Sequence, residues 1–388
     1  MTLTGEAFVA GTADVRDGGR WSSTAVRVRA GRSRPVPAGG GGVSRRVLGA
    51  GVLAAGVAVA AGACSDDGAG AAGQEVEQVT FLTTVGKQGR DAAAFVAEAK
   101  GFFAAHGLKV DIQPGRAGDY NHQQLAAGSA QYATVDGAGA VVRYATGKDT
   151  SFQVLAAVHQ QTVVGIVGLA GGRISSDPRS LVGRTLGTIK NAVPEVLWPA
   201  YAKAAGIDAK SVTWRYAATA DQLNQLVAAG TIDGSAQFVI GAPGIEAAAG
   251  KAGRKPEAVV IPYSTHLGSL YGGVLIAQKS TIDAHPAQAK RFAAALSMGL
   301  DYAVKNPQEA GQIMADQAGQ DPVVAAAELE RMRAYVFAAG VTTAGALDET
   351  RVAGMVGSLT AHGLIPQGMN PDLPKTIARF DLAPAATS

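Results

Sequence analysis

Short apolar, β-branched runs alternate with longer alanine-rich stretches along the chain from Val79 onward. Apolar runs bounded by turn residues predict buried strands, whereas the longer alanine-rich stretches predict helices. Strands and helices that alternate in this way are typical of an α/β protein with mainly parallel strands. The first series has predicted strands at 79–83, 108–113, 132–135, 154–159 and 163–169, and predicted helices at 91–105 and 120–127.

A second series of the same kind begins at Thr185. Its predicted strands are 185–189, 212–216, 236–240 and 258–262, and its predicted helices are 194–205 and 221–229. The segment 124–128, QLAAG, precedes one strand just as the segment 225–230, QLVAAG, precedes another. A helix that ends at a left-handed glycine and turns into a buried strand gives this pattern. Two similar lobes explain the repeat, and chance recurrence of helix-cap residues is the alternative.

The strand predicted at 273–277 is expected to return to the first lobe. Helices are predicted after it at 286–304, 307–318, 322–339 and 349–361. Proline occupies the first turn of three of these helices, where its fixed φ and its missing N–H are tolerated. The chain therefore ends in a run of helices rather than in a third α/β series.

Residues 44–63 have the features of a signal peptide. Arg45 and Arg46 precede a mildly hydrophobic run at 47–61, which is too short and too rich in alanine for a convincing spanning helix. Paired arginines before such a run are similar to a twin-arginine export signal. We therefore expect the protein to be exported.

Cys64 follows the small residues Ala-Gly-Ala, as in a lipoprotein cleavage box. Its thiol is the expected site of lipid attachment, although the leucine that is usual three positions earlier is missing. Ordinary cleavage after Ala63, which leaves an unpaired cysteine, is the alternative. Residues 64–78, rich in Gly, Ala and acidic residues, are predicted to form the anchor and a flexible tether. The expected location is the extracytoplasmic face of a bacterial cell membrane.

Residues 1–43 fit neither the export signal nor the folded body. They form a low-complexity run of Arg, Gly, Ser and Pro, and we predict that they are disordered or not translated. A start codon at Val43 would give the signal peptide a conventional length. The run therefore carries no weight in the assignment of function.

The formal net charge of +3 arises from residues near the N-terminus and does not describe the folded body. Residues 1–63 hold eight arginines and three acidic residues, and 26 basic and 28 acidic side chains follow from Cys64 onward. A slightly acidic body carries no basic footprint for nucleic acid. With 47% hydrophobic residues, the chain can bury a sizeable core.

Familiar catalytic and metal-binding motifs are missing from the sequence. The six histidines show no H-x-x-x-H or cysteine-linked spacing, and His106 and His362 each precede Gly-Leu at a predicted helix end, where capping explains them. No G-x-S-x-G elbow, phosphate loop or dinucleotide fingerprint occurs. We therefore expect no resident metal, no cofactor and no enzyme activity.

Several segments together resemble one known family, the ABC-importer binding proteins for nitrate, sulfonate, taurine and thiamine-pyrimidine precursors. The longest segment, 94–110, AFVAEAKGFFAAHGLKV, matches the family's first helix and second strand. Later landmarks match in order at 125–128, at 181–187, and at 226–230 with Asp233. The resemblance implies a type II periplasmic-binding-protein fold, an α/β fold with two lobes, two crossover strands and a central ligand cleft.

This fold implies how the chain is divided into lobes and which partners it binds. The first part of lobe I is expected at 79–170, lobe II at 171–270, and the return to lobe I with the C-terminal helices at 271–388. The implied partners are a small-molecule ligand, an ABC permease and its ATPase, and we expect the binding protein itself to be a monomer.

Ligands of this fold lie at the carboxyl ends of strands, where helix N-termini can face an anion or a carbonyl group. The candidate residues are Thr84, Gln88, Asp136, Gly137 and Gln160 in the first lobe, and Asn191, Glu195, Trp198 and Tyr216 in the second. Helix capping also explains Asn191 and Glu195. A tryptophan at the position of Trp198 also fits a core.

Two ligand classes remain open, a small heteroaromatic compound and an organic anion. The pyrimidine-binding branch of the family typically has Asn and His after the first strand, whereas 86–91 is GKQGRD here. A planar ligand would stack on Trp198, with Glu195 or Asp136 accepting its N–H groups. An anion would use helix amides together with Lys87 or Arg90.

Two other functions are alternatives to delivery into an importer. The binding lobes could serve a membrane signalling partner as a sensor. Fungal relatives of this fold make the thiamine pyrimidine and carry a cysteine-rich motif, but the single cysteine of this chain is Cys64. A neighbouring permease gene would favour the importer.

Overall fold

The computed structural model describes residues 76–384, apart from 117–118 and 369–370. The predicted N-terminal extension, the export signal with Arg45 and Arg46, and the lipidation site Cys64 lie outside the described residues. The described residues belong to one unit of the chain, Gly70–Ser388.

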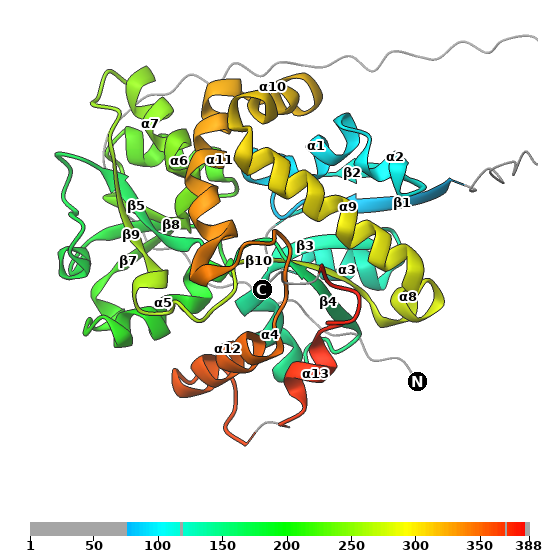
Figure 1. Ribbon diagram of the computed structural model, residues 1–388. Coiled ribbons are helices and arrows are strands. Elements are labelled where there is room, and N and C mark those ends of the chain that lie inside the picture. The colour runs from blue at the N-terminus through cyan, green and yellow to red at the C-terminus, as the bar shows by residue number, and fades with distance from the viewer. Residues whose placement is uncertain (1–75, 117–118, 369–370, 385–388) are drawn as a thin grey trace, which may run out of the picture. The chain divides into compact units, whose positions relative to one another are not determined.

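Two five-stranded sheets form the frame of this unit (Figure 1). The first sheet has the order β2-β1-β3-β10-β4, and the second has the order β7-β6-β8-β5-β9. Their strands are β1 Glu77–Leu82, β2 Leu108–Gln113, β3 Tyr132–Asp136, β4 Phe152–Ala157, β5 Val164–Leu169, β6 Thr185–Thr188, β7 Thr213–Tyr216, β8 Gly234–Phe238, β9 Ala258–Pro262 and β10 Gly273–Gln278. In both sheets the fourth strand lies antiparallel to its two neighbours, so each sheet is mixed rather than purely parallel.

Helices pack on both faces of each sheet. In the first lobe, α1 and α9 pack on one face while α3, α4 and α12 pack on the other, and in the second lobe α5 lies opposite α6 and α7. The helices are α1 Ala92–Ala99, α2 Phe102–Ala105, α3 Tyr120–Ala126, α4 Gly137–Ala145, α5 Val193–Ala204, α6 Ala220–Ala228, α7 Ala242–Lys251, α8 Lys279–Ala284, α9 Pro286–Lys305, α10 Pro307–Ala318, α11 Pro322–Val336, α12 Glu349–Ala361 and α13 Leu373–Ile377. This arrangement confirms the predicted two-lobed α/β architecture.

The most apolar runs of the sequence form β5 and β10, the antiparallel strands in the interior of the two sheets. All residues of β5, VGIVGL, and of β10, GVLIAQ, are buried, as expected for strands that have neighbours on both sides and helices on both faces. Stacked aromatic rings fill the layers beside them. Phe292 of α9 stacks on Tyr132 with 4.1 Å between ring centroids, and Tyr201 of α5 stacks on Tyr263 at 4.2 Å.

The pairing of β5 corrects the predicted division of the chain. The strand expected at 163–169 was assigned to the first lobe, which was expected to continue to residue 170. Instead β5 pairs with β8 and β9, so the chain already crosses to the second sheet within 158–163. A wholly apolar strand fits the middle of either sheet, so its sequence did not reveal its partner. The return within 263–272 to β10 in the first sheet is as predicted.

Some helices also differ from the prediction. The helix expected at 91–105 is interrupted at Gly101, whose φ of 72° is left-handed, and is divided into α1 and α2. Helices α4 and α7 were not predicted. Their sequences, GAGAVVRYA and APGIEAAAGK, are short and rich in glycine and alanine, and glycine inside a pattern weakens the prediction of a helix. The first of these omissions matters, because α4 begins at the candidate site.

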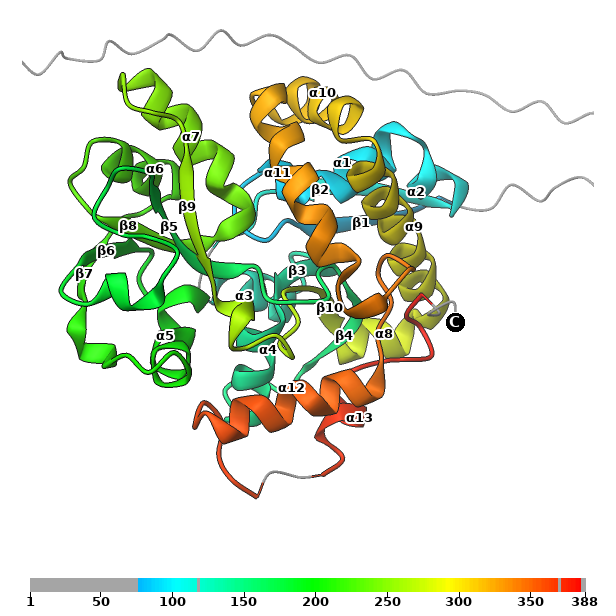
Figure 2. The same cartoon turned by 60° about the vertical axis from the view of Figure 1, so that its left-hand side comes forward.

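Helix α11 lies between α9 of the first lobe and α7 of the second in both views (Figures 1 and 2). Arg331 of α11 donates from Nη2 to Oε1 of Glu246 on α7 at 3.0 Å. Near the end of the same helix, the carbonyl oxygen of Tyr335 accepts the N–H of Gln160 in the first crossover at 2.7 Å. The two lobes are therefore linked by a helix as well as by the two crossover segments.

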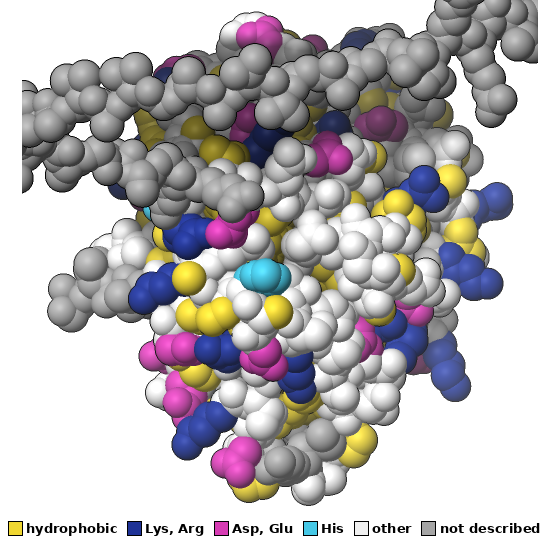
Figure 3. Space-filling view, turned by 90° about the vertical axis from the view of Figure 1, so that its right-hand side faces the viewer, with side chains coloured by type: hydrophobic (Ala, Val, Ile, Leu, Met, Phe, Trp, Pro, Cys, Tyr) yellow, Lys and Arg dark blue, Asp and Glu magenta, His cyan; other side chains and the backbone are white. Residues whose placement is uncertain are grey.

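None of the helices within residues 76–384 combines the length and apolar character needed to cross a membrane. No group of His, Cys, Asp and Glu side chains suited to a metal ion occurs in the described ranges. On the face drawn in Figure 3, basic and acidic side chains of the described residues are interspersed, without a continuous basic stripe.

Candidate functional site

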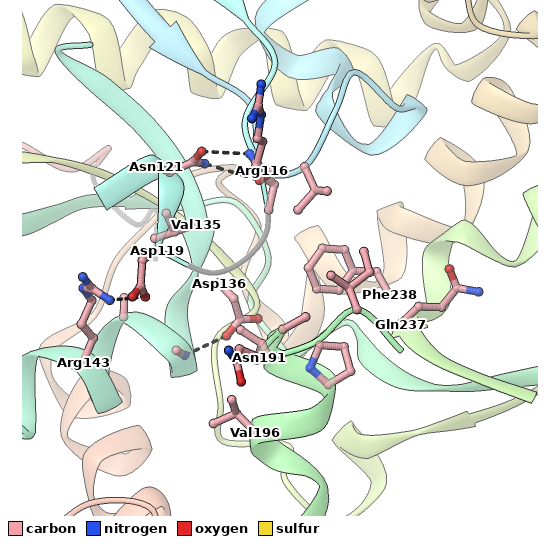
Figure 4. A pocket seen from close by; sticks show the side chains of 18 of the residues that line it. Arg116, Asp119, Asn121, Val135, Asp136, Arg143, Asn191, Val196, Gln237 and Phe238 are labelled. Carbon is pink, nitrogen blue, oxygen red and sulfur yellow. Dashed lines mark hydrogen bonds and ion pairs between the residues drawn. The ribbon is translucent and has the colours of Figure 1, made fainter. Parts of the chain in front are cut away.

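A cavity of about 690 Å³ is lined by residues of both lobes (Figure 4). The first lobe contributes residues after β1, at the end of β3 and in the first turns of α3 and α4, and the second contributes the start of α5 and α6 and the end of β8. A cavity of this size, at the carboxyl ends of strands, is typical of small-molecule sites, which occupy about 300–1,000 Å³.

Asp136 ends β3 and caps the N-terminus of α4. Its backbone is extended (φ −71°, ψ 132°), and its Oδ1 accepts the N–H of Gly139 at 2.9 Å. Aspartate is preferred at this position because its side chain satisfies an N–H group that the helix itself leaves free. The residue is 6% exposed and belongs to the wall of the cavity.

The other carboxylate oxygen of Asp136, Oδ2, is buried and has no hydrogen-bond partner within the described part of the chain. Burial raises the pKa of Asp136 to about 7, and the backbone N–H groups of Gly139 and Ala138 oppose this rise only in part. Burying an acceptor without a partner costs free energy. Asp136 thus carries, in the wall of the cavity, a buried oxygen without a partner among the described residues.

Two glycines allow the start of α4 to fit between its neighbours. A Cβ at Gly137 would lie 2.9 Å from the carbonyl oxygen of Gly272, which accepts the Gly137 N–H at 2.6 Å. A Cβ at Gly139 would lie 2.9 Å from Cγ2 of Val193, the first residue of α5. The N-terminal ends of α4 and α5, one from each lobe, are thus in contact close to Asp136.

Asn191, Glu195 and Tyr216 form a hydrogen-bonded group in the second lobe. Asn191 has a φ of 61°, a left-handed conformation that asparagine tolerates better than most residues. Its N–H donates to Oε2 of Glu195 at 2.6 Å, and the hydroxyl of Tyr216 donates to Oε1 of Glu195 at 2.7 Å. Both carboxylate oxygens of Glu195 are used inside the protein, and of the three residues Asn191 alone lines the cavity.

Asn121 of α3 ties together the carboxyl ends of β1 and β3. Its side chain is buried, and its Nδ2 donates to the carbonyl oxygens of Thr83 at 2.9 Å and Thr134 at 3.1 Å. Its Oδ1 accepts the N–H of Arg116 at 3.1 Å. Because its amide is used within the protein, Asn121 shapes the cavity by holding main-chain segments in place (Figure 4).

Charged side chains lie where the first lobe borders the cavity. Arg143 and Lys148 both contact the carboxylate of Asp119, at 2.5 and 2.8 Å, and the hydrogen bond from Lys148 is the main reason why the pKa of Asp119 is lowered. Arg116 lies with its guanidinium 4.7 Å from the ring centroid of Tyr120. The acidic and basic groups of this border therefore largely satisfy one another.

Arg90 connects the cavity with helix α11. Its buried side chain donates from Nη2 to the carbonyl oxygen of Val85 at 3.1 Å and lies 5.4 Å over the ring of Phe238 in the second lobe. Its backbone N–H donates to Oε2 of Glu328 at 3.2 Å. Burial raises the pKa of Glu328 to about 7, although the positive charge of Arg90 lowers it. Both the main chain and the side chain of Arg90 thus make contacts within the protein.

Three of the nine predicted ligand residues, Thr84, Asp136 and Asn191, line the cavity. The remaining six, outside the lining, are Gln88, Gly137, Gln160, Glu195, Trp198 and Tyr216. The N–H of Gln88 donates to Oδ2 of Asp91 at 3.2 Å, so this residue helps to fold the loop after β1.

Trp198 and Gln160 are structural residues. The indole of Trp198 is 2% exposed, packs against Tyr201, Trp214 and Tyr263, and donates from Nε1 to the carbonyl oxygen of Ala209 at 2.8 Å. The expected stacking of a ligand on Trp198 is therefore wrong, because this ring faces the core of the second lobe. Gln160 is fully buried in the first crossover, where its Nε2 donates to the carbonyl oxygen of Ala346 at 2.9 Å.

Sequence reasoning missed several residues of the cavity wall, among them Asn121, Arg143, Val193, Gln237 and Phe238. The last two end β8, which has the same place in the second sheet as β3 has in the first. The repeated segment before each of these strands was the sequence feature that pointed to this equivalence. Asn121 and Arg143 had no such feature, because their positions depend on the folding of α3 and α4.

Comparisons with known proteins agree with this architecture. The family model described as NMT1/THI5 like matches residues 90–310, more than half of the chain. A comparison with curated protein sequences gave no match.

Three solved structures illustrate the similarity of fold. The alkanesulfonate-binding protein SsuA from Xanthomonas axonopodis pv. citri, solved with MOPS bound, shows a TM-score of 0.60 and 16% identity over 79% of this chain and 99% of its own. The periplasmic nitrate-binding protein NrtA from Synechocystis PCC 6803 gives a TM-score of 0.60 and 15% identity over 79% of this chain and 87% of its own. A Candida albicans protein described as having the generic periplasmic binding protein fold gives 0.58 and 12%, over 80% of this chain and 98% of its own.

At these identities the structural matches establish the fold, and the family assignment rests on the match over residues 90–310. The predicted periplasmic-binding-protein fold is confirmed, as is the family resemblance carried by segments such as 94–110. The chain therefore belongs to the NMT1/THI5-like family.

Proposed function

We propose that this protein captures a small polar molecule in the cavity between its two lobes and delivers it to an ABC importer. The observation that carries the proposal is the cavity of about 690 Å³, whose wall combines the start of α4 in one lobe with the start of α5 in the other. A ligand held by both lobes favours their closed arrangement, and a closed binding protein is what a permease can distinguish from an open one.

The hinge elements support this proposal. Two crossover segments, 158–163 and 263–272, join the sheets, and α11 of the C-terminal helices contacts α7 of the second lobe. Domain closure of the hinge type requires a few connecting residues that absorb the rotation while each lobe keeps its own core. Relatives of this fold include proteins named for binding alkanesulfonate and nitrate. We propose that the ligand is an organic anion, the class to which alkanesulfonate belongs, or a small heteroaromatic compound, the other class that the sequence resemblance implies.

Ligand binding can be tested with the full chain in a thermal-shift screen against pyrimidines, flavin-like rings, sulfonates, nitrate and small carboxylates, followed by calorimetry. Small-angle scattering should then show compaction when the confirmed ligand is added. A particle whose scattering is unchanged by every ligand that binds would contradict delivery by lobe closure.

A matched pair of variants tests the cavity itself. Val196 lines the cavity and is 36% exposed, whereas Val182 is 53% exposed and lies outside the lining. We expect Val196→Arg to abolish binding because the new side chain occupies the cavity, and Val182→Arg to leave binding unchanged. Equal binding by both variants would place the ligand elsewhere.

The proposal includes export and a lipid anchor on the extracytoplasmic face of the membrane. Its support is the sequence around Arg45, Arg46 and Cys64. Replacing both arginines by lysine should leave the precursor inside the cell, and Cys64→Ala should release the mature protein into the medium. Membrane attachment that survives Cys64→Ala would remove the anchor from the proposal.

We further propose that the protein acts as a monomer with a permease and its ATPase as partners, and that it catalyses no reaction. Deleting the gene for a neighbouring permease should abolish uptake of the confirmed ligand. Uptake that persists, together with loss of a ligand-dependent signalling response, would favour a sensor instead.

A further inference from the structure

Two sides of helix α11 have different partners. Apolar side chains of this helix belong to the core of the first lobe, where Leu329 and Met332 are fully buried. Glu328, Arg331 and Tyr335 follow one another at intervals of three and four residues, which places them along one other side of the helix. In Figures 1 and 2 this helix lies between α9 of the first lobe and α7 of the second. The apolar side therefore serves the first lobe, and the polar side is the one that the second lobe contacts.

Glu328 connects the loop after β1 with the start of α7. Its side chain is 3% exposed, and its Oε2 accepts the N–H of Arg90 at 3.2 Å. A Cβ on Gly241 would lie 3.8 Å from Oε1 of Glu328, so this oxygen lies beside the glycine that precedes α7. Glycine offers no side chain to cap a helix, and a carboxyl group near a helix N-terminus interacts favourably with the partial positive charge there. Glu328 thus provides, from the first lobe, the group that the start of α7 lacks.

The next two residues of the polar side extend this contact. Nη2 of Arg331 donates to both carboxylate oxygens of Glu246 on α7, at 3.0 and 3.2 Å. Glu246 also accepts the N–H of Ala258 at 3.0 Å, so the ion pair reaches the start of β9 as well. The side chain of Tyr335 packs against the core of the second lobe, and its hydroxyl interacts with Ser264 in the second crossover. The polar side of α11 therefore contacts the second lobe from Glu328 to Tyr335.

The chemistry of the two sides determines how easily each contact can separate. Exposing the apolar side would cost the free energy gained by burying it in the core. The ion pair of Arg331 and Glu246 is partly open to solvent, with 40% and 24% of the two side chains exposed, and pairs of this kind contribute little net stability. Glu328 would keep its bond to the N–H of Arg90 if the second lobe moved away, since both residues belong to the first lobe. The second-lobe contact of α11 is therefore suited to separation, as polar contacts between moving domains are.

This contact lies beside the cavity and outside its lining. Arg90 and Phe238 line the cavity from the two lobes, and the guanidinium lies 5.4 Å from the ring centroid. Glu328, Arg331 and Tyr335 are not among the lining residues. The free energy that these three residues contribute to the approach of the lobes is therefore independent of which ligand occupies the cavity.

We propose that the polar side of α11 is a closure contact, which the second lobe makes when the lobes approach and loses when they separate. This inference rests on the proposed lobe closure, for which it names a contact remote from the ligand. Such a contact raises the fraction of closed protein, and the apparent affinity for every ligand that needs closed lobes rises by the same factor. A rigid strut would instead keep both sides of α11 in contact in every state.

The separation of the lobes can be measured without a ligand. Gln123 and Gln225 are exposed residues of α3 and α6, the helices that precede β3 and β8. Spin labels on Gln123→Cys and Gln225→Cys report the distance between the lobes by double electron–electron resonance. The full chain is used with Cys64→Ala, because Cys64 is the single natural cysteine and would otherwise be labelled.

Arg331→Glu is the test variant and Arg333→Glu is its matched control. Arg331→Glu places two carboxylates against each other at Glu246, and we expect the ratio of separated to closed lobes to rise about threefold or more. Arg331→Gln removes the charge without reversing it and should shift the ratio in the same direction by less. Arg333→Glu makes the same change of charge at an exposed position of the same helix and should leave the distances unchanged. Circular dichroism shows whether each variant is folded.

Equal distances in the Arg331 variants and in Arg333→Glu would overturn the proposal. A short distance in all of them would mean that α11 is a rigid strut, and a long distance in all of them would mean that its polar side does not hold the lobes together. A shift of the Arg331 variants toward shorter distances would also contradict it. Ligand capture is tested separately by Val196→Arg, so the closure contact can fail while the proposed function stands.

Discussion

Arg351 donates hydrogen bonds from its guanidinium to both the side-chain and the main-chain oxygens of Gln160, 191 residues away in the sequence. The same guanidinium lies 4.6 Å from the ring centroid of Tyr271. Gln160 belongs to the first crossover segment and Tyr271 to the second. One side chain of α12 therefore contacts both connections between the lobes, close to where any rotation of the lobes must occur.

Replacing Arg351 should destabilise the protein through this contact. In Arg351→Ala, the buried Oε1 of Gln160 loses its donor, and we expect the free energy of unfolding to fall by about 1–3 kcal/mol, the cost of an unsatisfied buried acceptor. Urea denaturation followed by tryptophan fluorescence measures the change. Arg333→Ala, which removes an exposed side chain of α11, is the control and should change stability by less than about 0.5 kcal/mol. Similar losses in both variants would argue against a specific role of Arg351.

Trp198 should matter for stability and not for ligand affinity. Its ring is buried against Tyr201, Trp214 and Tyr263, so Trp198→Ala is expected to cost about 3–5 kcal/mol through a large cavity. Trp198→Phe keeps most of the buried surface and should retain a folded protein with unchanged affinity for the confirmed ligand. A selective loss of affinity in the folded Phe variant would restore the ring as a ligand platform.

Much of the fold follows from local patterns in the sequence. The strands predicted at 108–113 and 258–262 coincide with β2 and β9, and the repeated segments before 132 and 236 precede strands with the same place in the two sheets. These features depend on neighbouring residues alone, such as a glycine cap followed by an apolar run. The wrong assignment of β5 has a different origin, since strand pairing is a long-range choice that an apolar run does not specify.

The candidate site was less predictable for the same reason. Asp136 could be predicted because a residue directly after a buried strand of an α/β protein lies at the edge where ligands bind. Trp198 could not be placed, because the face of α5 that meets the core depends on packing against Tyr263 and Trp214. The role of Asn121 depends on carbonyl groups of β3 and of the loop after β1. Such roles arise only when distant segments are brought together.

The buried carboxyl group of Glu328 should make stability depend on pH. Its pKa is raised from 4.5 to about 7, mainly by burial and also by Asp91, while Arg90 opposes the rise. The folded protein therefore keeps a proton that the unfolded chain loses, and this contribution to stability is present at low pH and declines as pH rises from about 4.5 to about 7. The decline amounts to at most about 3 kcal/mol.

Glu328→Gln removes the titrating group but keeps an oxygen for the Arg90 N–H. We expect the free energy of unfolding of this variant, measured by urea denaturation between pH 4.5 and 8, to depend less on pH than that of the original protein. Glu330→Gln is the matched control, because Glu330 is an exposed residue of the same helix. A pH dependence that is the same in all three proteins would show that folding does not raise the pKa of Glu328.

Gly139→Ala should weaken ligand binding without destabilising the helix that carries it. Alanine favours helices over glycine by about 1 kcal/mol, so α4 itself should gain stability. However, the new Cβ would lie 2.9 Å from Cγ2 of Val193, and the clash would act across the contact between the lobes. Overpacking of this kind costs about 1–3 kcal/mol. Because the cost falls on the arrangement in which α4 and α5 touch, we expect the affinity for the confirmed ligand to fall about tenfold or more.

Gly354→Ala in α12 is the control, since a Cβ there would meet nothing within 4 Å. It should match Gly139→Ala in stability and the original protein in affinity. If Gly139→Ala binds the ligand as tightly as Gly354→Ala, the lobes do not need this contact, and closure between α4 and α5 is not part of capture.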